Sequence, residues 1–121
     1  MATLMVNTGK AVVTNRVKGA GTEPNYIGWG TGAGTAGATD TTLFTEVGTR
    51  IAGTSTQQTT TTTSDTYQVV GTITAGSSLT ITNAGLLDAL TVGNLFVKGD
   101  FTGLALNSGD SIQFTFKVAF A

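Results

Sequence analysis

The sequence contains no cysteine and no histidine among its 121 residues. Without cysteine it has no disulfide framework, no thiolate nucleophile and no cysteine-ligated zinc site. Without histidine it lacks the imidazole general base, the histidine-dependent catalytic triads and the commonest metal ligand. These absences predict a protein that is not an enzyme and that uses neither a cofactor nor a metal.

Charged side chains are scarce as well. They make up 11% of the chain, with six basic and seven acidic residues and a formal net charge of -1, whereas about 25% is usual for soluble domains. So few basic side chains release few counterions, and we therefore expect no nucleic-acid partner. The mean hydropathy is nevertheless +0.20. Either a partner or further copies of the chain cover part of the surface, or the abundant threonine and glycine simply count as nearly neutral.

Long apolar runs are missing too. No segment approaches the roughly 18 consecutive apolar residues that mark a membrane-spanning helix. Residues 1–7 show neither the basic region nor the long apolar core of a secretory signal. We therefore expect a protein that is made in a cytoplasm and has no membrane partner.

Threonine and glycine are what the chain has in abundance, with 26 and 17 residues respectively. Threonine is β-branched and favours strands, while glycine marks turns. Alternating apolar and polar segments recur between turn signals at the spacing of about 8–12 residues that is typical of β-sandwiches. We predict a single all-β domain, an antiparallel β-sandwich of jelly-roll or immunoglobulin-like type. Its roughly six to eight short strands occupy residues 21–121, after a short helix or arm over residues 1–20.

Strand patterns are clearest in the second half of the chain. Residues 65–75 and 79–83 alternate with a period of two, and residues 84–88 extend the second of these strands with a bulge at Gly85. Residues 94–101 form another strand. Residues 104–106 form a short separate piece. The last strand alternates most regularly, and its apolar side chains are Ile112, Phe114, Phe116, Val118 and Phe120. Such a face predicts a central position in a sheet.

The first half is less regular. Residues 8–18 predict a short helix that ends at Gly19 and Gly21, with an N-terminal strand as the alternative. Residues 26–30 form a brief aromatic strand, residues 31–38 a loop and residues 49–52 a short strand. Asp40 suits a helix cap, which predicts one or two helical turns that tuck Leu43 and Phe44 inward. The threonine-rich residues 54–64 are a mobile loop or an exposed edge strand, and we favour the strand.

The sequence contains no strong motif for catalysis, nucleotide binding or metal binding. Residues 32–37 match the G-x-G-x-x-G pattern, but no long amphipathic helix follows, so a dinucleotide site is not expected. The carboxylates include no pair on one strand face and no calcium-loop motif. Asp40, Asp65 and Asp110 stand where helix caps and turns need them. We therefore interpret them as structural residues.

Five segments carry a family resemblance: residues 26–32 (YIGWGTG), 40–46 (DTTLFTE), 65–75 (DTYQVVGTITA), 81–89 (ITNAGLLDA) and 109–116 (GDSIQFTF). Together they resemble the small virion structural proteins of tailed bacteriophages, found among capsid decoration (cement) proteins and tail-fibre-like proteins. The resemblance implies a β-sandwich without catalysis, whose copies assemble on a larger shell or tail. The run Thr59–Thr63 departs from the pattern, and its role stays open at this point.

The resemblance supplies a function to test. We expect a capsid decoration protein on the virion capsid surface, made in the host cytoplasm, which binds the lattice of the major capsid protein as a homo-oligomer, a dimer or a trimer. A tail-fibre or baseplate module for host attachment is the alternative. The N-terminal segment is either a docking arm or an edge helix, and Trp29 is either a core plug or an exposed anchor. The candidate partner interface consists of Leu4, Met5, Val6, Tyr26, Ile27 and Trp29.

Overall fold

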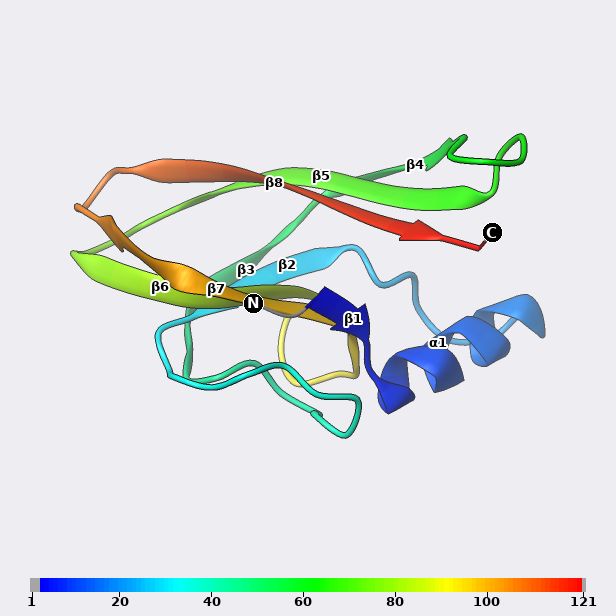
Figure 1. Ribbon diagram of the computed structural model, residues 1–121, viewed down its shortest axis with the longest axis horizontal. Helices are drawn as coiled ribbons and strands as arrows, with labels where there is room; N and C mark the ends of the chain where they lie inside the picture. The colour runs from blue at the N-terminus through cyan, green and yellow to red at the C-terminus, as the bar shows by residue number, and fades with distance from the viewer. Residues whose placement is uncertain (1–2, 121) are drawn as a thin grey trace.

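Two antiparallel β-sheets pack face to face, with one helix beside them, in a computed structural model that describes residues 3–120 (Figure 1). The five-stranded sheet has the order β1-β7-β6-β2-β3, and the three-stranded sheet has the order β4-β5-β8. The predicted all-β sandwich with a short N-terminal helix is confirmed. Over the described range the elements are β1 (Thr3–Met5), α1 (Asn7–Val17), β2 (Tyr26–Gly30), β3 (Glu46–Ala52), β4 (Thr54–Gln58), β5 (Thr66–Thr74), β6 (Leu79–Leu87), β7 (Leu95–Leu106) and β8 (Ser111–Ala119).

The core lies between the two sheets, where alternate side chains of facing strands meet. From the three-stranded sheet, β5 contributes Val69 and Ile73, which are almost fully buried. From the five-stranded sheet, β2 contributes Ile27 and Trp29. The Trp29 ring meets Phe114 of β8 edge to face, with ring centroids 6.5 Å apart. Trp29 is therefore a core residue.

Helix α1 packs against β7 of the five-stranded sheet. Its buried residues are Gly9 and Val12, and a Cβ atom at residue 9 would clash with the carbonyl oxygen of Phe96. The helix ends at Val17 with Lys18 as its C-cap, after which Gly19 takes a φ of +88°. The predicted helix is thus confirmed over the alternative strand.

The described part of the N-terminal segment is integrated into the sandwich rather than extended from it. Residues 3–5 form β1, which pairs antiparallel with β7 at the edge of the five-stranded sheet. Residues 1 and 2 of the predicted arm lie outside the described residues. The segment therefore combines an edge strand with a helix that covers the neighbouring strand.

Two expectations about element positions are wrong. Strand β8 lies at the edge of the three-stranded sheet and not in its centre, because β5 is its one partner strand within the described chain. Residues 40–45 form no helix. Asp40 instead accepts hydrogen bonds from the backbone N–H of Gly37 and from Lys98, so its carboxylate serves a loop and not a helix end.

Strand β6 has its predicted range but not its predicted bulge, and β7 extends beyond its predicted end. The register of β6 against β7 shifts on either side of Gly85, between residues 81 and 83 and between residues 86 and 87, and not at Gly85 itself. Residues 104–106 continue β7 instead of forming a separate piece. Strand β6 therefore matches its predicted range to within one residue, whereas β7 is longer than the sequence pattern indicates.

The threonine-rich segment divides into a strand and a loop. Residues 54–58 form β4, the exposed edge strand that was predicted, and a loop follows it. The Asp65 carboxylate accepts hydrogen bonds from the backbone N–H groups of Thr60, Thr61 and Thr62 at 2.8–3.0 Å. It also accepts one from the Thr66 hydroxyl at 2.8 Å. These bonds hold the pKa of Asp65 well below its ordinary value, and the hydrogen bond from Thr62 has the largest effect. One carboxylate thus orders the threonine run.

Candidate functional site

The predicted interface residues do not form one surface. Val6, Ile27 and Trp29 are 0%, 0% and 1% exposed, so a partner does not reach them without opening the sandwich. The other three, Leu4, Met5 and Tyr26, are half-buried. Aromatic and apolar side chains are common in cores as well as in interfaces, and their presence in the sequence does not separate the two.

Among the described charged residues, Lys98 on β7 is the most deeply buried, with a side chain that is 0% exposed. Its Nζ donates hydrogen bonds to Asp40 Oδ2 at 3.0 Å and to the Thr42 carbonyl oxygen at 2.8 Å. The ammonium also lies 3.2 Å from the centroid of the Phe44 ring. The N–H of Gly37 and then the Lys98 ammonium hold the pKa of Asp40 below its ordinary value. Lys98 therefore fastens the β2–β3 loop onto the sheet.

A second ion pair fastens the loop between β6 and β7. Arg50 Nε lies 2.6 Å from Glu46 Oε2 on the same strand. Arg50 Nη1 donates hydrogen bonds to the carbonyl oxygens of Ala89 and Val92, at 2.9 and 2.7 Å. In this loop Leu90 and Val92 are 49% and 83% exposed. We call these two residues the loop patch.

The acidic side chains of residues 3–120 serve local structure. Asp88 accepts hydrogen bonds from the backbone and side-chain nitrogens of Asn94, and Asp110 accepts one from the N–H of Asn107. Within the same range, no three acidic, cysteine or histidine residues group together as metal ligands would. The charged residues described here thus position loops and turns.

An apolar groove of about 300 Å³ lies beside α1, where the start of β5 and the residue after β8 approach the helix. Val17 and Phe120 in this groove are 83% and 56% exposed. Tyr67 forms part of its wall and donates a hydrogen bond to Glu23 at 3.1 Å. Burial and the Glu23 carboxylate raise the pKa of Tyr67, which keeps the phenol protonated. The apolar groove is lined by Val12, Val13, Val17, Pro24, Tyr67, Phe96 and Phe120, with Arg16 and Glu23 beside them.

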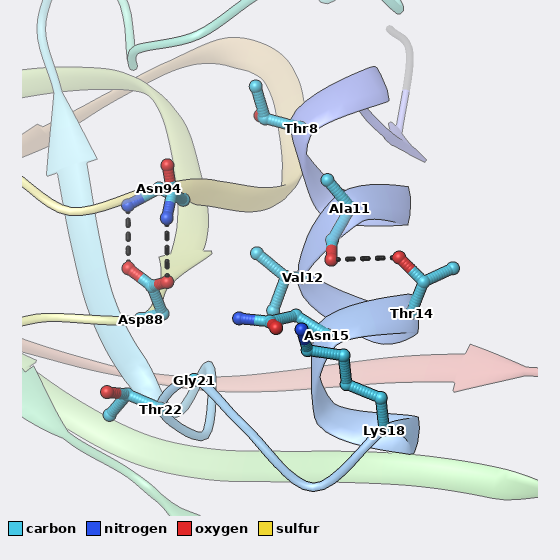
Figure 2. A pocket seen from close by; sticks show the side chains of 10 residues that line it. All are labelled: Thr8, Ala11, Val12, Thr14, Asn15, Lys18, Gly21, Thr22, Asp88 and Asn94. Atoms are coloured by element: carbon cyan, nitrogen blue, oxygen red, sulfur yellow. Dashed lines mark hydrogen bonds between the residues drawn. The ribbon is translucent and has the colours of Figure 1, made fainter.

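A pocket of about 510 Å³ lies along another face of α1 (Figure 2). We call it the polar cavity, because most of the residues that line it have polar side chains. The helix contributes Thr8, Asn15 and Lys18 to its wall. Across from them lie Asp88 and Asn94, which hydrogen-bond to each other at 3.0 Å. Figure 2 shows the Asn15 side chain extending from the helix toward this pair. The polar cavity thus brings hydroxyl, amide and ammonium groups together.

Comparisons with known proteins add no relative. The chain matches no protein-family model, no curated protein sequence and no solved structure. In the described part of the chain, no helix has the length and apolarity needed to cross a membrane. The apolar groove, the loop patch and the polar cavity are therefore the surfaces on which a functional argument rests.

Proposed function

We propose that this chain is a non-enzymatic structural protein of a phage virion that decorates and stabilises the capsid by binding the lattice of the major capsid protein. The observation that carries the proposal is the apolar groove, where two large apolar side chains are exposed beside a hollow. Exposed apolar side chains that gather at one place mark contact sites. The resemblance of residues 26–116 to small virion proteins supplies the partner class.

The apolar groove suits a contact in which each copy binds weakly but many copies together bind stably. Val17 and Phe120 are exposed over 83% and 56% of their surface, so covering both contributes about 2–4 kcal/mol per subunit. Association itself costs at least that much, and one copy therefore holds its place poorly. A capsid offers many equivalent sites, and copies that also contact one another gain avidity.

Binding to undecorated mature heads of the phage that encodes the chain tests this proposal. We expect purified wild-type protein to saturate the heads at micromolar concentration. Val17→Asp places a charge in the groove and should lower the number of bound copies sharply. Val92→Asp is the matched control, because Val92 is also 83% exposed but lies in the loop patch. Failure of the wild type to bind, equal losses for both variants, or density for the chain on the tail alone would each overturn the proposal.

A tail-fibre or baseplate module for host attachment is the second candidate. The polar cavity favours it, because the amide of Asn15, the ammonium of Lys18 and the hydroxyl of Thr22 suit the hydroxyl groups of a surface glycan. Saturable binding to host cells that Asn15→Ala reduces and Val17→Asp does not, together with a tail location in cryo-electron microscopy, would support this candidate over capsid decoration.

A further inference from the structure

The sandwich has four sheet edges within residues 3–120, and three of them are short, interrupted or strongly polar. Strand β1 is three residues long, and beyond it the same edge is formed by β7, whose register against β6 is irregular between Asp100 and Leu104. Strand β3 has an irregular register against β2 between Ile27 and Trp29. Strand β4 has five residues, all threonine, serine or glutamine. Short strands, bulges and polar side chains are the features that prevent an edge from pairing with another chain.

The fourth edge, that of β8, is neither short nor interrupted, and one of its two faces is apolar. Its nine residues pair with β5 in one continuous register from Ser111 to Ala119. The strand contains no proline and one charged residue, Lys117. Its inward face carries Ile112, Phe114, Phe116 and Val118, which are half-buried. A long, regular edge with an apolar face is open to strand addition.

The backbone groups at the free edge of β8 belong to its odd-numbered residues. Just beyond β8, the N–H of Phe120 donates a hydrogen bond to the Asp65 carbonyl oxygen at 2.9 Å. At the other end, the Asp110 carbonyl oxygen accepts one from Ala75 at 2.8 Å. The backbone N–H and C=O groups of the even-numbered residues therefore point toward β5. Because these groups point to alternate sides along a strand, those of the odd-numbered residues point away from β5. The opposite edge presents the N–H and C=O groups of Ser111, Gln113, Thr115, Lys117 and Ala119.

We propose that β8 pairs antiparallel with β8 of a second copy of this chain, about a twofold axis at Thr115. The two three-stranded sheets then join into one sheet of six strands. Ser111 lies opposite Ala119 of the second copy, Gln113 opposite Lys117, and Thr115 opposite Thr115. All five outward residues take part, which gives roughly ten hydrogen bonds between the copies. The proposal does not depend on a place in a virion.

Charge and packing favour this register. An axis at Lys117 would put two lysines directly opposite each other and would shorten the overlap, whereas the axis at Thr115 keeps them apart. On the inward face, Phe114 comes to lie opposite Phe116 of the second copy, next to the Phe114–Phe116 stack within each chain, whose ring centroids are 5.8 Å apart. The arrangement is isologous, as twofold interfaces must be, and gives β8 the central place that its alternation indicates.

Charge reversal at the axis tests the pairing. Thr115 is exposed, so Thr115→Lys and Thr115→Glu should leave the fold unchanged while each sets like charges face to face in the dimer. We expect each variant alone to dimerise at least about tenfold more weakly than the wild type. An equal mixture of the two should restore dimers, because opposite charges then meet. Sedimentation or light scattering over a range of concentrations measures both effects.

One proline substitution at each edge of the three-stranded sheet separates an effect on pairing from an effect on folding. Thr115→Pro removes an N–H that faces the free edge, which an edge strand tolerates, and should yield a monomer with unchanged circular dichroism. Gln57→Pro makes the matched change on β4 and should leave the dimer intact. A wild type that is monomeric up to submillimolar concentration, or a dimer that the Thr115 variants do not affect, would overturn the proposal.

Discussion

Replacing Lys98 by methionine tests whether the buried ammonium holds the β2–β3 loop in place. Methionine keeps most of the apolar stem of lysine but removes the charge. Asp40 then keeps the N–H of Gly37 at 2.9 Å and loses its cation. The Thr42 carbonyl oxygen loses the donor that lies 2.8 Å away. We therefore expect a less stable fold in which residues 31–45 loosen first.

The size of the effect follows from the exposure of the two partners. Breaking a buried ion pair by removing one member costs about 3–5 kcal/mol, because the other charge is left without compensation. The Asp40 side chain is 24% exposed, whereas that of Lys98 is fully buried. Water can therefore solvate part of the remaining carboxylate. We expect the free energy of unfolding at pH 7 to fall by about 2–3 kcal/mol.

Urea unfolding at a fixed protein concentration, followed by the fluorescence of Trp29, measures this loss as a lower midpoint at an unchanged m value. Lys10→Met is the control, because Lys10 is exposed on α1 and its replacement should change stability by no more than about 0.5 kcal/mol. Adding Asp40→Asn to Lys98→Met should cost little more, since the pair is already broken. A loss below about 1 kcal/mol for Lys98→Met would show that the buried ammonium does not hold the loop in place.

Three further predictions concern the threonine loop, the effect of acid and the helix contact. Asp65→Asn removes the carboxylate that orders the threonine run, so amide exchange of Thr60, Thr61 and Thr62 should speed up; unchanged exchange would contradict that role. The pKa of Asp40 is lowered in the folded state, so its contribution to stability is complete above its ordinary pKa and is lost as the pH falls through the folded value. The stability difference between the wild type and Asp40→Asn should therefore shrink in acid, and a growing difference would disprove the sign. Gly9→Ala should destabilise the protein by about 1–3 kcal/mol in thermal or urea unfolding although alanine favours helices, because its Cβ clashes with the Phe96 carbonyl oxygen. The control Thr14→Ala, on the exposed side of the helix, should be neutral or slightly stabilising.

The fold class, the helix and most of the strands follow from local sequence patterns alone. Alternation in residues 66–74 and 111–119 marks strands with one inward face, because neighbouring side chains of a strand point to opposite sides. Gly19 marks the end of the helix, because the chain there takes a positive φ that glycine adopts readily. These features depend on residues that are close together in the chain, and a local pattern therefore reveals them.

Strand order and the nature of the surface depend on contacts between segments that are far apart in the chain. Alternation reports that one face of β8 is covered, but it carries no information on which hydrogen-bonding edges are occupied, and β8 lies at an edge. Asp40 has the form of a helix cap in sequence, whereas its cation partner Lys98 comes 58 residues later. Trp29 fits both a core and an interface until the facing Phe114 is known. The apolar groove draws on segments from Val12 to Phe120, and it exists only once those segments pack together.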